Sequence, residues 1–121
     1  MRYAVLMYTR PNHTKAMTPE AIQAVMRKHE EIGEDAKDEI VGGVGMAAPD
    51  ETTTLRLGSD GVETTSGPFK EGREQLSAYY ELEVATEERA REIVGLILDD
   101  QVTAVELRAI HDSAPRRQWT A

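Results

Sequence analysis

The chain turns sharply at residues 66–76, SGPFKEGREQL, directly before its most regular strand pattern, LSAYYELEV, at residues 76–84. Pro68 fixes its own φ angle and favours an extended backbone at Gly67, which also permits close approach of another segment. Phe69 is the only phenylalanine of the chain and is expected to anchor the turn to a core. The stretch therefore predicts a rigid, charge-flanked turn that leads into a strand.

Residues 76–84 alternate between apolar and polar side chains, which is typical of a strand with one buried face. Tyr80 falls on the apolar face and is expected to pack in the core, whereas Tyr79 falls on the polar face. The apolar face comprises Leu76, Ala78, Tyr80, Leu82 and Val84, and the other face comprises Ser77, Tyr79, Glu81 and Glu83.

Helix and hairpin signals surround this strand. Thr18 and Thr86 are expected helix N-caps, because acidic residues follow each of them within the first turn. Asp60-Gly61 is a hairpin turn signal. The expected strands cover residues 2–8, 40–48, 52–57, 62–65, 76–84 and 103–110, and the expected helices cover residues 18–38 and 86–100.

The order of these elements predicts an α+β fold, a ferredoxin-like β-α-β-(hairpin)-β-α-β arrangement with an antiparallel sheet and both helices on one face. At 121 residues the chain is expected to form one domain, at residues 1–112, with a C-terminal tail at 113–121. Helices on one side leave the other sheet face bare, and a bare face needs a cover. Trp119 in the tail is expected to pack against the body of a dimer, and a frayed terminus is the alternative.

Composition argues against several classes of protein. The formal net charge is −8 and Arg116-Arg117 is the only basic cluster, which disfavours nucleic-acid binding. The chain has no cysteine, so disulfides and thiolate nucleophiles are excluded, and no apolar run is long enough to cross a bilayer. A cytoplasmic protein is expected. The histidines at 13, 29 and 111 lack the spacing of a zinc motif, so neither a metal nor a cofactor is expected.

The turn and its strand resemble the DGPF signature of the YCII-related proteins, which continues as Glu-x-Lys-Glu-x-Leu into a strand with paired tyrosines. Arg73 stands where lysine is usual, and Ser66 replaces the aspartate of that signature. Similar proteins pair through their bare sheet faces, so the resemblance implies a homodimer in the form of a dimeric α+β barrel. The matching positions are Gly67, Pro68, Phe69, Glu71, Glu74, Leu76, Tyr79 and Tyr80.

His29 is the sharpest single candidate for chemistry, because it lies on the apolar stripe of the first helix and is expected to be mostly buried. Two interpretations remain open: a core histidine held by one hydrogen bond, or a general base that titrates near neutral pH. The resemblance supports the second, since a His–Asp pair has been proposed as the reactive unit in similar proteins. The stripe comprises Ile22, Val25, Met26, His29, Ile32, Gly33 and Ala36.

Polar positions of the motif and of the last strand complete the candidate site. Arg73 and Tyr79 are candidates for steadying a developing oxyanion beside His29. Each position also has a structural alternative. The motif charges can form a solvated charge run, Ser66 a plain turn, Tyr79 a pocket wall and Arg108 a cross-strand ion pair. Substrate binding is assigned to Ser66, Glu71, Glu74 and Arg108.

Two functions from different classes remain open. The resemblance implies a cofactor-free isomerase or lyase that acts on a small organic acid by proton transfer, with His29 as the base. The alternative is a non-catalytic small-molecule-binding or regulatory accessory protein of the sigma-factor-associated type. Serine at position 66 cannot supply the charge of the family's aspartate, which favours the alternative slightly. The sequence names no substrate.

Overall fold

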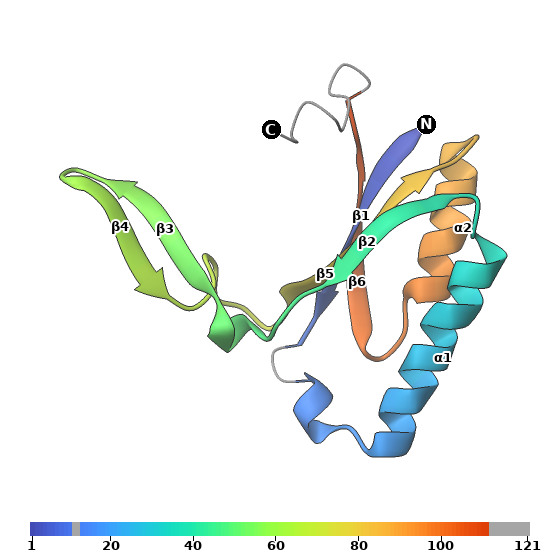
Figure 1. Cartoon of the computed structure of the whole chain (residues 1–121), viewed down its shortest axis with the longest axis horizontal. Coiled ribbons are helices and arrows are strands. Elements are labelled where there is room, and N and C mark those ends of the chain that lie inside the picture. The colour runs from blue at the N-terminus through green and yellow to red at the C-terminus, as the bar shows by residue number, and fades with distance from the viewer. Residues whose placement is uncertain (11–12, 112–121) are drawn as a thin grey trace.

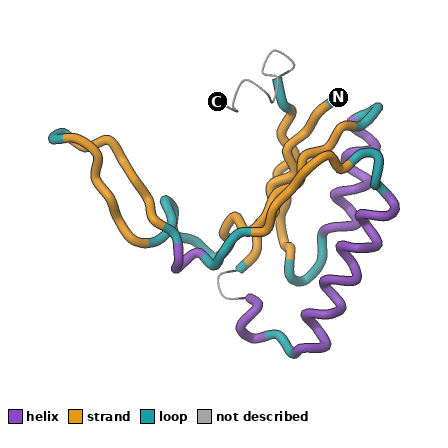
Figure 2. Tube along the Cα trace, viewed as in Figure 1, coloured by secondary structure: helices purple, strands orange, loops and turns teal. Residues whose placement is uncertain are grey.

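The computed structural model describes residues 1–10 and 13–111. It shows an α+β chain in which the helices lie against one side of an antiparallel sheet (Figures 1 and 2). The strands are β1 (Arg2–Thr9), β2 (Ile40–Gly45), β3 (Thr53–Gly58), β4 (Gly61–Ser66), β5 (Gln75–Glu83) and β6 (Val102–Ala109), the α-helices are α1 (Pro19–Asp35) and α2 (Glu87–Ile97), and 3-10 turns form at His13–Ala16 and Pro49–Glu51.

The main sheet has four strands in the order β2-β5-β1-β6, and each neighbouring pair is antiparallel. This order is compatible with the ferredoxin-like fold that the sequence predicts. β3 and β4 form a separate two-stranded sheet. The dimeric barrel involves a second chain and stays a prediction, and the tail that carries Trp119 lies outside the described residues.

Both helices begin at the predicted caps. The Thr18 Oγ1 atom accepts a hydrogen bond of 3.1 Å from the Ala21 N–H, and the Thr86 Oγ1 atom accepts one of 3.1 Å from the Arg89 N–H. These bonds satisfy backbone donors of the first turn, which have no partner within the helix. Within the described ranges, neither helix is long and apolar enough to cross a membrane.

The core lies between the helices and one face of the main sheet. Every second residue of β1, from Tyr3 to Thr9, is buried there, because alternate side chains of a strand share a face. Leu82 of β5 is also buried in this layer, and Tyr80 packs against it. The helices supply Ile32 and Ala36 at the end of α1, and Ala90, Ile93 and Ile97 from α2.

The first half of α1 does not reach this core. Ile22 is 40% exposed and Met26 is 59% exposed, so the prediction that both face the sheet is wrong. Val25 and His29 are half-buried, and they face a cavity instead of packing against core side chains. The apolar period locates the side of the helix that faces the sheet, but it does not say how closely the sheet approaches.

The turn at residues 66–76 is tied to the hairpin and not to the core. Gly67 has a φ of 98°, a conformation that favours glycine, so the extended backbone expected there is wrong. Its N–H donates to the Thr52 carbonyl at 2.7 Å, and its carbonyl accepts from Thr54 Oγ1 at 2.7 Å. Phe69 is 60% exposed and not a core anchor; the Arg56 guanidinium lies 4.5 Å from the centre of its ring.

A bulge moves one residue of β5 to the other face. The register of β1 and β5 shifts between Met7 and Tyr8, which places Leu76 opposite Tyr8. Leu76 is therefore on the face away from the helices and is 41% exposed, so its predicted place beside Tyr80 is wrong. We call this uncovered face the open face; it carries Leu6, Tyr8, Val44, Leu76, Tyr79, Glu81, Glu106 and Arg108.

The hairpin of β3 and β4 projects from the body on the side of the main sheet opposite the helices (Figure 1). Its turn contains the predicted Asp60-Gly61 step, where Gly61 has a φ of 120°. We call residues 53–66 the arm. It exposes three large aliphatic side chains, Leu55 at 63%, Leu57 at 88% and Val62 at 68%.

Burial on α2 predicts the effect of truncating its side chains. Ile93 has no exposed surface, so Ile93→Ala should lower the free energy of unfolding by about 2–5 kcal/mol through lost burial and a residual cavity. Leu96 lies on the same helix and is 47% exposed, so Leu96→Ala is the matched control and should cost about 1 kcal/mol or less. Urea unfolding of both variants measures this, and equal losses would contradict the described packing.

Candidate functional site

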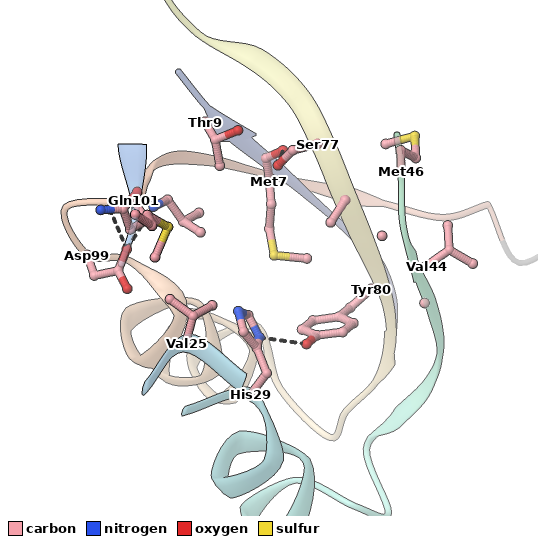
Figure 3. Close-up of a pocket in the computed structure, with 15 residues that line it drawn as sticks. Met7, Thr9, Val25, His29, Val44, Met46, Ser77, Tyr80, Asp99 and Gln101 are labelled. Carbon is pink, nitrogen blue, oxygen red and sulfur yellow. Dashed lines mark hydrogen bonds between the residues drawn. The ribbon is translucent and has the colours of Figure 1, made fainter. Parts of the chain in front are cut away.

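A cavity of about 390 Å³ lies between the first half of α1 and the core face of the sheet (Figure 3). Its walls are mainly apolar, and three of the five methionines of the chain line it. Methionine side chains are flexible and polarizable, so such a wall can adapt to different shapes of ligand. The lining residues are Met7, Thr9, Met17, Val25, His29, Gly43, Val44, Gly45, Met46, Ser77, Ala78, Tyr80, Asp99, Gln101 and Val102.

Two polar rings meet on the wall of this cavity. The Nδ1 atom of His29 lies 2.8 Å from the Oη atom of Tyr80, and the rings meet edge to face with their centres 6.0 Å apart. The hydrogen bond forms with either tautomer: Nδ1–H donates to the phenol oxygen, or the phenol O–H donates to Nδ1. In Figure 3 the other ring nitrogen, Nε2, is turned away from Tyr80. Among the described residues, Nε2 has no hydrogen-bond partner.

Both rings are held in their neutral forms. Burial lowers the pKa of His29, the nearby Lys28 charge lowers it further, and Asp99 opposes this. Burial raises the pKa of Tyr80. At neutral pH the pair is therefore an uncharged imidazole and an uncharged phenol, and one nitrogen of the imidazole is available to accept a proton.

Gly43 on the edge strand β2 is what lets the Tyr80 ring lie where it does. Gly43 is opposite Tyr80 in the β2–β5 register. A Cβ atom at Gly43 would stand 2.5 Å from Cδ1 of Tyr80 and 2.7 Å from the Tyr79 carbonyl oxygen, closer than real Cβ contacts. The sequence pattern indicates only that this glycine weakens a strand; a glycine directly across from an aromatic residue is the signal that sequence reasoning missed.

A carboxylate forms one end of the cavity. The Oδ1 atom of Asp99 accepts from the backbone N–H groups of Gln101 and Val102, both at 2.7 Å, and Oδ2 accepts from Lys28 Nζ at 2.6 Å. Burial opposes ionisation, but these hydrogen bonds hold the pKa of Asp99 below its ordinary value. Among the described residues the lining contains this anion, which Lys28 already pairs, and no lysine or arginine, so these residues offer a negatively charged ligand no unpaired cation.

The structure places the predicted catalytic residues apart. His29 lines the cavity, but Tyr79 points to the open face and is 39% exposed. Arg73 lines a separate depression with Arg10, Glu74 and Thr103. Neither Arg73 nor Tyr79 is brought to the imidazole, whereas Tyr80, which the sequence assigns only to core packing, contacts it directly.

The predicted substrate-binding residues also lie elsewhere. Glu71 and Glu74 line a second cavity, of about 580 Å³, with Tyr8, Phe69 and Leu76. Ser66 ends β4 on the arm and does not line the His29 cavity. Arg108 lies on the open face, where it pairs with Glu106 at 3.2 Å along the same strand and not across strands.

Sequence reasoning also missed the hydrogen bond that Tyr8 makes on the open face. Its phenol O–H donates a hydrogen bond to the Glu106 carboxylate. That bond raises the pKa of Tyr8 and lowers the pKa of Glu106, so the pair is a neutral phenol and a carboxylate at neutral pH. Within residues 1–10 and 13–111, no group of three or more histidine or acidic side chains is placed to hold a metal ion.

The fold and the cavity define a small α+β domain with a neutral histidine beneath its first helix. A family model described as YCII-related domain matches residues 1–97, from β1 to the end of α2. Because the match covers most of the chain, the protein belongs to the YCII-related domain family. No curated protein matches the chain.

Gly43 offers a test of how the ring pair is held. Gly43→Ala should displace the Tyr80 ring, lower the free energy of unfolding by about 1–3 kcal/mol and shift the NMR signal of His29 Nδ1. A Cβ atom at Gly45 would meet nothing within 4 Å, so Gly45→Ala is the control and should change neither quantity appreciably. An unchanged His29 signal in the Gly43 variant would contradict the described contact.

The lowered pKa of His29 predicts how stability depends on pH. In the unfolded chain the imidazole titrates near its ordinary value of 6.5, so below that pH the unfolded state binds the proton more readily than the folded state. The contribution of neutral His29 is therefore present above about pH 6.5 and is lost as the pH falls below it. Lys28, Asp99 and Tyr80 are the titratable neighbours that set this behaviour.

Urea unfolding of the wild type and His29→Gln across this pH range measures the effect. The stability difference between the two proteins should shrink as the pH falls, because only the wild type loses the contribution of the neutral imidazole. A direct NMR titration of His29 with a midpoint at or above its ordinary pKa would show that the argument is wrong.

Proposed function

We propose that the cavity beneath α1 binds a small molecule and that His29 transfers a proton to or from it. The observation that carries the proposal is the 2.8 Å contact of His29 Nδ1 with Tyr80, which fixes the imidazole while leaving Nε2 without a partner among the described residues. A general base must be neutral at the working pH and within reach of the proton that it takes. The lowered pKa of His29 meets the first condition, and its place on the cavity wall supports the second.

The proposed step uses both nitrogens of the ring. In the tautomer that carries hydrogen on Nδ1, the lone pair of Nε2 takes a proton from a carbon next to a carbonyl group of the ligand. The imidazolium that forms still donates Nδ1–H to Tyr80, and this hydrogen bond becomes stronger when its donor is charged. Return of the proton to another carbon gives an isomerisation, and loss of a leaving group from the neighbouring carbon gives an elimination. Neither step needs an electron acceptor.

The lining narrows the substrate class. The resemblance implies a small organic acid, with Arg73 as a candidate for steadying the developing oxyanion, but Arg73 lines another depression. Within the His29 cavity an acid would face Asp99, and the described residues of the lining include no cationic side chain. We therefore propose an uncharged, largely apolar carbonyl compound, whose apolar part would lie against Met7 and Met46.

A non-catalytic binding function is the second candidate. The observation that favours it is the dispersal of the expected catalytic set, since neither Arg73 nor Tyr79 reaches His29. Without Arg73 or Tyr79 beside the imidazole, a developing oxyanion would depend on lining groups such as Tyr80, Ser77 or Thr9 for hydrogen bonds. In the binding function, His29 and Tyr80 only orient a ligand by hydrogen bonds, which is the role expected of an accessory protein.

We further propose a homodimer that forms through the open face. Val44 is 49% exposed, Leu76 41% and Tyr79 39%, and the strand register places all three on that face with Leu6. A second open face is a suitable cover, because it presents the same mixture of aliphatic, tyrosine and paired charged groups. Light scattering that returned a monomer at every concentration would contradict this proposal.

Exchange of substrate hydrogen for deuterium tests the catalytic proposal across a whole class of candidate substrates at once. A panel of small ketones and lactones is incubated with the protein in D₂O, and deuterium uptake is followed by mass spectrometry. His29→Gln should reduce protein-dependent uptake by about 10²–10⁴-fold, as expected for loss of a general base. Tyr80→Phe removes the phenol that holds Nδ1 and should give a smaller reduction.

Tyr79→Phe is the matched control, because it removes a phenol of the same strand from the opposite face. It should leave deuterium uptake unchanged. Uptake that survives in His29→Gln would overturn the assignment of the base. Binding of panel members with no uptake in the wild type would favour the accessory function instead.

A further inference from the structure

The arm has one side without any charge. In the β3–β4 register Leu55 lies opposite Thr64 and Leu57 lies opposite Val62, so these side chains share one side of the hairpin. The charged residues Arg56 and Glu63 lie opposite each other on the other side. The uncharged side comprises Thr53, Leu55, Leu57, Val62, Thr64 and Ser66. A side with three exposed aliphatic residues and no charge stands out in a chain of which 30% is charged.

The charged side of the arm is already bound to its own chain. Thr54 donates to the Gly67 carbonyl at 2.7 Å, and Arg56 donates to the Phe69 carbonyl at 3.2 Å while covering the Phe69 ring. These contacts fix the base of the hairpin. The aliphatic side has no such cover at its outer end, and a two-stranded hairpin is at best marginally stable in water without one.

The direction of the arm indicates what covers it. The arm leaves the body on the side opposite α1 and α2, which is the side of the open face (Figure 1). A body seated on the open face would therefore lie beside the arm. We propose that the arm packs its uncharged side against the same second copy of the chain that covers the open face, an inference that rests on the homodimer proposed above.

The exposed area of the chain exceeds that of a compact monomer by about the area that one interface covers. It amounts to 8778 Å², whereas a compact monomer of 13.4 kDa exposes about 6,500 Å². Even if the twelve residues outside the described ranges are allowed the full area of an unfolded chain, about 1,900 Å², the remainder exceeds that of a compact domain of its size by about 800 Å². A standard interface covers about 800 Å² of each partner.

Charge favours a second copy over a lipid surface. Asp60 stands at the tip of the arm with Glu63 close behind it, so an anion would be the first group to enter a bilayer. Two copies of a chain with a net charge of −8 repel each other, and an uncharged contact side reduces that repulsion where the surfaces meet. In a two-fold dimer each copy would give its arm to the other, which closes the assembly.

The test compares one charge at two positions of the arm. Leu57 is 88% exposed, so Leu57→Asp should leave the fold of the monomer intact, as circular dichroism can verify. It should weaken dimerisation by about 10- to 100-fold or more in sedimentation velocity, because a buried leucine contact is replaced by an unpaired charge. Ser59→Asp adds the same charge in the exposed turn of the arm and is the control, with no weakening expected.

A variant of the open face separates this inference from the dimer itself. Tyr79→Glu should weaken dimerisation whether or not the arm takes part. If Tyr79→Glu weakens the dimer while Leu57→Asp does not, the inference about the arm is overturned and the sheet-face dimer stands. If the wild type is a monomer at every concentration, both the sheet-face dimer and the arm contact are overturned. Slower hydrogen exchange of residues 53–66 at concentrations that favour the dimer would support the arm contact independently.

Discussion

Two helices can cover only one face of the four-stranded sheet, and most other features of the structure follow from that constraint. On the covered face, α2 and the end of α1 exclude water from Val5, Leu82 and Ile93. The first turns of α1 stand over a cavity instead, and a polar histidine can point inward there without displacing core side chains. On the uncovered face, the same strands carry tyrosines and ion pairs that range from half-buried to exposed. The candidate site and the proposed interface are therefore two sides of one sheet.

The site places two polar rings, those of His29 and Tyr80, next to an apolar core, and a hydrogen bond between them offsets the cost of their burial. Burial of an imidazole or a phenol without a partner is costly, but His29 and Tyr80 satisfy each other. No buried side-chain nitrogen or oxygen in the described part of the chain lacks a hydrogen-bond partner. The pair is thereby neutral, oriented and only half-buried, less buried than the sequence pattern predicts for His29. These properties suit a proton carrier as well as a ligand anchor.

Sequence reasoning recovers the elements better than their contacts. The caps at Thr18 and Thr86, the hairpin turn and the alternation that turns Tyr80 toward the helices all depend on neighbouring residues, and each is confirmed. Leu76 is misplaced because a bulge depends on how two strands fit together, which no single strand reveals. Of the candidate site, His29 is located correctly on the helix. Its partner Tyr80 is not predicted, because the contact depends on the distance between helix and sheet, on the strand register and on the glycine opposite the Tyr80 ring.

The edge strand β2 borders both the cavity and the open face, so ligand binding and association could influence each other through it. Gly43 touches the ring that holds the imidazole, while its neighbour Val44 borders the cavity and also belongs to the open face. A partner that presses on Val44 and a ligand that presses on Tyr80 would thus act on adjacent residues of a single strand. Linkage then requires reciprocity: if association changes the affinity for the ligand, the ligand changes the affinity for association by the same factor. β2 has three glycines among six residues and pairs with a strand on one side only, two features that weaken the hold of a sheet on a strand.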